Sequence, residues 1–311
     1  MAPWYRLVED GDRLVLEHGR SAVVLEGRAV RALLPRLLPL LDGTRSGHDL
    51  AAELGVAIRP AIDQVLELLA ASGLLLDGPT PAEPGCPAAR VVAAAYGLSP
   101  SDAAARLGSA SLGVVGSGRA GAEVARLLHA AGVGEVRKLS WRPSDHAGRL
   151  DLAVVTPSPH EAAELAGWNT AALESGLSWL GARPFDGRVA MVGPLVVPGE
   201  SCCHECLLHR LAGHVEYGSD LAAVEAVPVE AGESPTLERI AAGVTAHLAL
   251  CWLGGRDPAL PGVLYAIEAR PRLAFHAHTV LRVPRCPACS PVERRAPRVP
   301  WHEAEIEVEV A

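Results

Sequence analysis

Two CxxC motifs that lie far apart in the chain tie its middle to its C-terminal part if they share one metal ion. The first motif is Cys203 and Cys206, and the second is Cys286 and Cys289. Two thiolates separated by two residues can hold one side of a tetrahedral Zn²⁺, and a second such pair completes the shell. A closed shell of four sulfurs leaves no position for water, so the metal would be structural. The spacing therefore predicts a fold that is locked by one structural zinc ion.

The residues around the first motif allow two alternative interpretations of it and exclude a third. Cys202 could replace Cys203 as a ligand, although its spacing to Cys206 is less usual. Redox chemistry of the thioredoxin type is the other interpretation of a CxxC pair. A zinc deaminase is excluded because its signature needs an H-x-E motif, whereas His204 and Glu205 are adjacent here.

Length and composition limit the class of protein. A chain of 311 residues is long enough for two domains, and its formal net charge of -8 argues against a nucleic-acid partner. No apolar run reaches the roughly 18 residues of a spanning helix, so no membrane partner is expected. The N-terminus shows no secretory signal. We therefore expect a cytoplasmic protein whose seven cysteines stay reduced.

Residues 1–78 have the pattern of a small α+β domain. Three short apolar runs predict an antiparallel meander; they are Trp4–Val8, Arg13–Glu17 and Ala22–Glu26. Three helices should follow. The first contains Pro35 and should be broken or start late, the second begins after Ser46 with Asp49 in its first turn, and the third spans 59–72. Three strands followed by three helices are typical of a winged-helix-like domain.

A winged-helix-like domain often binds DNA, and its last helix would then enter the groove. Here that helix carries one basic residue, Arg59, and two acidic residues, Asp63 and Glu67, which would repel phosphates. A DNA-binding regulator is therefore an alternative that the charges disfavour.

Beyond the first domain, residues 79–109 are predicted as a proline-rich linker and a connecting helix, and residues 110–292 as one α/β domain. Strands and helices alternate in the second region, which predicts a Rossmann-like, mostly parallel, doubly wound sheet. The predicted strands are Leu112–Val115, Glu135–Leu139, Leu152–Val155, Leu177–Leu180, Val189–Val192 and Leu264–Glu268. Residues 293–311 read as a tail.

A glycine-rich turn follows the first strand of this domain and opens a helix. Gly116, Gly118 and Gly121 form a GxGxxG motif, which can bring backbone N–H groups close to a phosphate. Close packing of a strand on a helix explains the same glycines without any ligand. NAD binding is disfavoured because the next strand is followed by no acid before Asp145.

The stretch LGVVGSGRAGAEVARLLHAAGVG, followed downstream by CHECLLHR and CPAC, resembles the ubiquitin-activating (E1, ThiF, MoeB) superfamily over roughly residues 110–290. The resemblance implies a Rossmann-like fold with zinc, in proteins that adenylate the C-terminal carboxylate of a small protein or peptide.

This chain departs from that pattern where the family holds ATP. Adenylating members carry an aspartate-rich stretch where this chain has LSWRPSDHAGRL, and a metal-binding Asp where it has Thr156–Pro159. In-line chemistry on ATP needs such a carboxylate for Mg²⁺. No cysteine nucleophile lies between His214 and Pro235. We therefore expect a vestigial nucleotide loop, no ordinary binding of Mg²⁺-ATP, and no catalytic residue.

Residues 1–78 in turn resemble the RiPP recognition element, similar to PqqD. In that family a leader peptide adds a strand beside the third β-strand and packs on the third helix. The physical basis is β-augmentation, in which a free strand edge supplies backbone hydrogen bonds. The resemblance implies a peptide site on the third strand and third helix; its candidate residues are Val23, Val24, Leu25, Arg59, Asp63, Leu66 and Ala70.

Together the two parts resemble the ocin-ThiF, or F, proteins of azole and thiopeptide biosynthesis. The resemblance implies a non-catalytic scaffold that delivers a ribosomal precursor peptide to a YcaO-type cyclodehydratase for azoline formation. A homodimer is a further candidate assembly. The main alternative is an E1-like enzyme that adenylates a peptide carboxylate.

Overall fold

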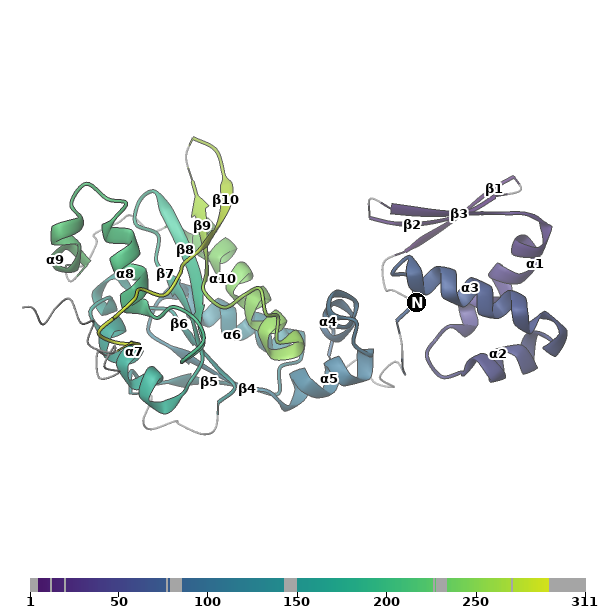
Figure 1. Ribbon diagram of the computed structural model, residues 1–311, viewed down its shortest axis with the longest axis horizontal. Coiled ribbons are helices and arrows are strands. Elements are labelled where there is room, and N and C mark those ends of the chain that lie inside the picture. Colours follow the sequence, from purple (N-terminus) through teal and green to yellow (C-terminus); the bar gives the residue numbers. More distant parts are fainter. Residues whose placement is uncertain are drawn as a thin grey trace, which may run out of the picture.

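The computed structural model describes residues 5–11, 13–19, 21–76, 78, 86–142, 150–225, 227, 234–269 and 271–290. Three predictions concern residues outside these ranges: Trp4 in the first strand, the proline-rich part of the linker, and the tail. Asp145 also lies outside them. The chain has a mixed α/β fold that contains a three-stranded sheet and a seven-stranded sheet (Figure 1).

The N-terminal module has the predicted order of three strands and three helices. Its antiparallel sheet has the order β1-β2-β3, and three helices with two short 3₁₀ turns follow. The bounds are β1 Arg6–Asp10, β2 Arg13–His18, β3 Ser21–Glu26, α1 Arg28–Leu37, a turn at Leu38–Leu40, α2 Gly47–Leu54, a turn at Val56–Ile58 and α3 Arg59–Ala71. Leu14 and Leu16 of β2 are fully buried against Leu34 of α1 and Leu69 of α3. These residues form the core of the module.

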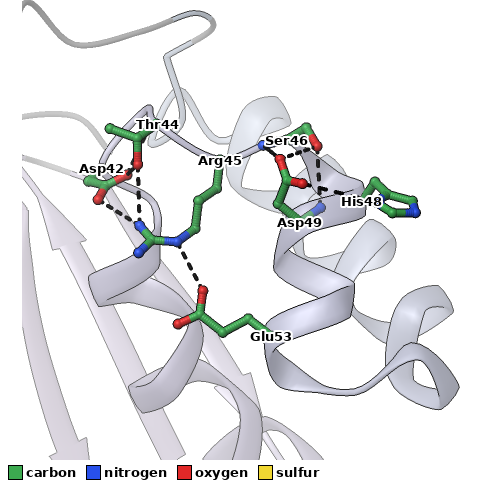
Figure 2. A network of polar contacts seen from close by, with 7 residues as sticks. All are labelled: Asp42, Thr44, Arg45, Ser46, His48, Asp49 and Glu53. Atoms are coloured by element: carbon green, nitrogen blue, oxygen red, sulfur yellow. Dashed lines mark hydrogen bonds and ion pairs between the residues drawn. The ribbon is translucent and has the colours of Figure 1, made fainter.

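The sequence predicted the start of α2 correctly but not the course of α1. Ser46 caps α2 as predicted: its hydroxyl accepts from the Asp49 N–H, and the Asp49 carboxylate accepts from the Ser46 N–H (Figure 2). The predicted interruption of the first helix by Pro35 is wrong, because α1 continues through this residue and changes to a 3₁₀ turn only at Leu38. A proline removes the i→i−4 hydrogen bond of its own N–H and can kink a helix without ending it.

The large sheet has the strand order β10-β9-β8-β7-β6-β4-β5. Its bounds are β4 Ser111–Val115, β5 Glu135–Leu139, β6 Leu152–Val155, β7 Trp179–Arg183, β8 Val189–Val196, β9 Val263–Glu268 and β10 Ala274–Thr279. Strands β5, β4, β6 and β7 are parallel, but β7 to β10 pair antiparallel. The prediction of a mostly parallel sheet is therefore wrong for this half. The connections β7–β8 and β9–β10 are too short for the crossover that parallel strands need.

Helices cover both faces of this sheet. Their bounds are α4 Ala89–Tyr96, α5 Pro100–Ser109, α6 Arg119–Ala131, α7 Glu164–Ser175, α8 His204–Ala212, α9 Leu221–Glu225 and α10 Pro235–Leu250, followed by a π-helical turn at Cys251–Gly255. Helices α4, α5, α6 and α10 share one core with Val114 and Val154, whereas α7 and α8 pack on the other face with Val115 and Val155. The predicted connecting helix is in fact two helices, α4 and α5, and both contribute to the first core.

Of the helices in the described part of the chain, none combines the length and the apolar composition of a membrane-spanning helix.

Candidate functional sites

The four predicted cysteine ligands lie together. Cys203 precedes α8 and Cys206 lies in its first turn, while Cys286 and Cys289 follow β10. The Sγ–Sγ distances are 3.8 Å from Cys203 to Cys206, 3.7 Å from Cys203 to Cys286 and 3.5 Å from Cys206 to Cys289. Four sulfurs at about 2.3 Å from a tetrahedral Zn²⁺ lie about 3.8 Å from one another. The cluster therefore fits a metal such as zinc, and its distances are too long for disulfide bonds.

The surroundings of the cluster favour the charged thiolate at Cys206, whereas burial raises the pKa of Cys203 and Cys289. The Val283 N–H donates to Cys206 Sγ at 3.3 Å. Burial opposes the charged form of Cys206, but this N–H and the neighbouring thiols lower the pKa of the Cys206 thiol. The guanidinium of Arg282 donates to the carbonyl oxygens of Gly199 and Cys289 and so ties the second motif to the rest of the domain.

The structure distinguishes Cys203 from its neighbour. Cys202 is buried but is not one of the four cysteines whose Sγ atoms approach one another within 4.8 Å. Burial raises the pKa of both thiols, that of Cys202 to about 12, so the pKa does not separate them. The sulfur positions do, and they favour Cys203 as the ligand.

The glycine-rich turn connects β4 to α6 and is packed against the chain that follows β6. A Cβ on Gly116 would lie 2.4 Å from the Thr156 carbonyl oxygen, and one on Gly118 would lie 2.6 Å from the same atom. A Cβ on Gly121 would lie 2.4 Å from Thr156 Oγ1. Close packing of the chain on itself is therefore enough to require all three glycines.

A carboxylate of the chain itself occupies this turn. Glu161 Oε2 accepts from the Ser117 N–H at 2.8 Å, from the Ser117 hydroxyl at 2.9 Å and from the Ser158 N–H at 2.8 Å. Glu161 Oε1 accepts from the Trp141 indole N–H at 3.1 Å. Burial opposes the charged form, but the two backbone N–H groups of Ser158 and Ser117 lower the pKa of Glu161 to about 2. An internal anion thus binds an N–H group of the glycine-rich loop, for which the sequence left both phosphate binding and simple close packing open.

Glu161 was not among the predicted site residues, although the sequence around it carries a local signal. It lies two residues after Pro159, just outside the Thr156–Pro159 segment. Ser158 and Glu161 form a capping box around a short 3₁₀ turn, and this box directs the carboxylate back toward Ser117. The S-x-x-E spacing is recognisable in the sequence.

A cavity of about 390 Å³ lies beside the glycine-rich turn, and its lining includes Arg119, His160, Arg183, Phe185 and Glu238. Arg183 forms an ion pair with Glu225 through Nη2, and its Nη1 is buried without a hydrogen-bond partner among the described residues. The cavity thus has two arginines, Arg119 and Arg183, in its lining at the carboxyl ends of the parallel strands, where ligands of open α/β sheets bind.

Strand β3 forms one edge of the N-terminal sheet, because its partner in the described sheet is β2 alone. Val23 and Leu25 pack against the core, whereas Val24 is 42 % exposed on the opposite face. His18 and Ser21 flank a two-residue loop and pair with each other, so they exchange both backbone hydrogen bonds. Counting from this pair, the N–H and C=O groups of Val24 point away from β2, toward the free edge.

The predicted residues of α3 lie along one side of that helix. The Arg59 Nε donates to Asp63 at 3.1 Å, and Ala70 is exposed. Leu66 packs against the cluster of α1 and α2 and lines a cavity of about 190 Å³ together with Arg45. Arg45 is held there by Asp42 and Glu53, as Figure 2 shows. These contacts bring Arg59 and Asp63 together and place Leu66 against the region around α2.

The fold and sites define a mixed α/β protein with a four-cysteine cluster and a small α+β module at its N-terminus. No family model matches the sequence, and no curated protein is similar enough in sequence to count as a match.

Solved structures show what the chain is similar to. A heterocyclase, TruD, shares 25 % identity at a TM-score of 0.70, with 93 % of this chain and 42 % of that chain covered. A heterocyclase in complex with substrate and cofactor shares 24 % identity at a TM-score of 0.70, with 93 % of this chain and 39 % of that chain covered. E. coli MccB in complex with AMPCPP and MccA shares 15 % identity at a TM-score of 0.66, with 93 % of this chain and 98 % of that chain covered.

The likeness shows that this chain has the fold of these proteins and supports the predicted resemblance to the ThiF-like superfamily. The chain spans about two fifths of the length of the heterocyclases and nearly the whole of MccB.

Proposed function

We propose that this chain is a non-catalytic scaffold that binds the leader of a ribosomal precursor peptide and presents it to a separate YcaO-type cyclodehydratase. The observation that carries the proposal is the free edge of β3, whose Val24 has backbone groups available for an added strand. In this interpretation residues 1–78 act as a PqqD-like recognition element, with Val23 and Leu25 as part of its wall. A homodimer stays a prediction.

The fold likeness supports a role with peptides. One similar heterocyclase was solved with its substrate, and MccB was solved with MccA. This chain spans about two fifths of the length of the similar heterocyclases, and in this proposal the YcaO-type cyclodehydratase is a partner chain. That partner would carry out azoline formation, so the scaffold itself needs no nucleotide.

Glu161 supports the non-catalytic part of the proposal. Its carboxylate already accepts from the Ser117 N–H in the glycine-rich turn, so a phosphate at that group would meet a negative charge. The four-cysteine cluster would hold a structural Zn²⁺ that ties the second motif to α8.

The proposal is tested by selecting binders from a displayed library of random twelve-residue peptides with the full chain. Val24→Pro removes an N–H group from the free edge of β3, and edge strands tolerate proline. The matched control is Glu9→Pro, because the same counting from the Asp10–Arg13 pair directs the Glu9 N–H to the opposite edge, on β1.

We expect Val24→Pro to abolish enrichment of peptides and Glu9→Pro to preserve it. Circular dichroism must show the same secondary structure for both variants. Enrichment that survives Val24→Pro, or that both prolines abolish equally, would contradict a site on β3.

A second candidate function is ATP-dependent adenylation of a peptide carboxylate. The cavity beside the glycine-rich turn, with Arg119 and Arg183 in its lining, favours it, as does the fold likeness to MccB, which was solved with ATP. Measuring ATP–pyrophosphate exchange with the selected peptides separates the two functions. Exchange above the rate of a peptide-free control would support the enzyme and refute the scaffold.

A further inference from the structure

The outer face of the N-terminal sheet carries a row of three valines that leads to the free edge. Val8 of β1 lies opposite Val15 of β2, which lies opposite Val24 of β3. Val8 is 49 % exposed and Val24 is 42 % exposed, while the face below them is closed by buried leucines. Side chains that are directly opposite on one face of a sheet contact each other. The row is therefore an apolar stripe that ends at the β3 edge.

Charged residues flank this stripe unequally. On one side Arg6 and Glu17 form an ion pair at 2.6 Å, and Ala22 ends the row at the edge. On the other side the row is Asp10, Arg13 and Glu26, so it holds one more acid than base.

Glu26 ends this second row at the edge itself. It contacts Arg13 at 3.3 Å, yet its side chain remains 68 % exposed. The edge thus presents a small residue, an apolar residue and an acidic residue at alternate positions of one strand.

Resting on the proposed function, we propose that the peptide segment bound by β3 carries a basic residue two positions before a β-branched apolar residue. The N–H and C=O groups of Ala22, Val24 and Glu26 point to the free edge, so an added antiparallel strand would pair directly with these residues. A peptide side chain opposite Val24 lies on the outer face and extends the valine row. Because the strands run in opposite directions, the peptide residue opposite Glu26 comes two positions earlier.

The order of the two peptide residues is a consequence of strand direction. A peptide that paired in parallel would place the basic residue after the apolar one. The sheet of β1, β2 and β3 is antiparallel throughout, and an antiparallel addition continues its hydrogen-bond pattern. Ala22 is small, so we expect no strong preference at the third position.

The test sequences the peptides that the same random twelve-residue library yields with the full chain and with Glu26→Lys. The wild-type chain should enrich Lys or Arg two positions before Val, Ile or Thr, and Glu26→Lys should enrich Asp or Glu there. For one purified peptide and its Lys→Glu variant, charge pairing across strands should change the dissociation constant about fivefold in opposite senses for the two proteins. Glu17→Lys is the matched control, since it makes the same charge change on the same face but on β2, away from the edge.

The outcomes separate this inference from the proposed function. A switch of the preferred charge with Glu26→Lys, and none with Glu17→Lys, supports the recognition pattern. If peptide binding depends on the Val24 N–H but shows no charge preference, the recognition pattern is wrong and the proposed site on β3 stands. A charge preference of the reverse order overturns antiparallel addition. No enriched peptide with any protein overturns both proposals.

Discussion

Replacing Glu161 by glutamine tests whether the internal carboxylate holds the glycine-rich turn together. Glutamine keeps the size of the side chain and one acceptor oxygen but removes the negative charge. The carboxylate accepts four hydrogen bonds, from the Ser117 N–H and hydroxyl, the Ser158 N–H and the Trp141 indole. Charge-assisted bonds of this kind are stronger than neutral ones. We therefore expect Glu161→Gln to lower the free energy of unfolding.

The magnitude follows from the pKa of Glu161, which falls from 4.5 to about 2 in the folded chain. A shift of that size corresponds to roughly 3 kcal/mol, and partial solvent exposure reduces it to about 2 kcal/mol. Because the folded pKa is the lower one, this stabilisation is complete above pH 4.5 and is lost as the pH falls toward about 2. The variant should therefore approach the wild type in acid.

The assay is thermal unfolding of the two proteins between pH 7 and pH 3. At pH 7 about 2 kcal/mol corresponds to a Tm lower by roughly 4–8 °C for a domain of this size. Glu174→Gln is the control, because it removes an equal charge from an exposed position of α7. Acid also releases a thiolate-bound metal, so only the difference between variant and wild type is informative. A Tm unchanged at pH 7, or a difference that does not shrink below pH 4.5, would refute the role given to Glu161.

Two further predictions concern the metal and the glycines. Elemental analysis should find about one zinc per chain, and Cys286→Ser should lower the Tm or give insoluble protein; a fully folded, metal-free preparation would contradict the zinc assignment. Gly121→Ala should destabilise the chain because its Cβ would meet Thr156 Oγ1, whereas Gly167→Ala, which meets nothing within 4 Å in α7, should stabilise it by about 1 kcal/mol. Chemical denaturation of both variants checks this pair, and equal effects would show that the packing at Gly121 is looser than described.

The sequence predicted most features that depend on local patterns. The strands of the N-terminal module, the cap of α2 by Ser46 and the position of Cys203 next to Cys206 are set by residues close in the chain. The joining of Cys203 to Cys286 is long-range, but the chemistry of a four-sulfur shell made it predictable.

Features that depend on the path of the chain were harder to predict. Strand β8 has the apolar composition of a buried strand in either direction, so composition did not show that it pairs antiparallel with β7. The extension of α1 through Pro35 was missed because a proline can either break a helix or only kink it, and the local sequence does not show which. The position of Glu161 depends on the approach of the segment after β6 to the glycine-rich turn, which is a tertiary contact.

The glycine-rich turn that binds Glu161 and the free edge of β3 belong to modules with separate cores. Effects of changes at distant sites without shared partners usually add. In a scaffold, Glu161→Gln should therefore lower stability without changing peptide affinity. Val24→Pro should lower peptide affinity without changing stability. Combining them should give the sum of the two effects. In an adenylating enzyme the peptide and the nucleotide must meet, so the two changes would show coupling in a peptide-dependent ATP–pyrophosphate exchange. Additivity in binding together with absent exchange is the result that the scaffold requires.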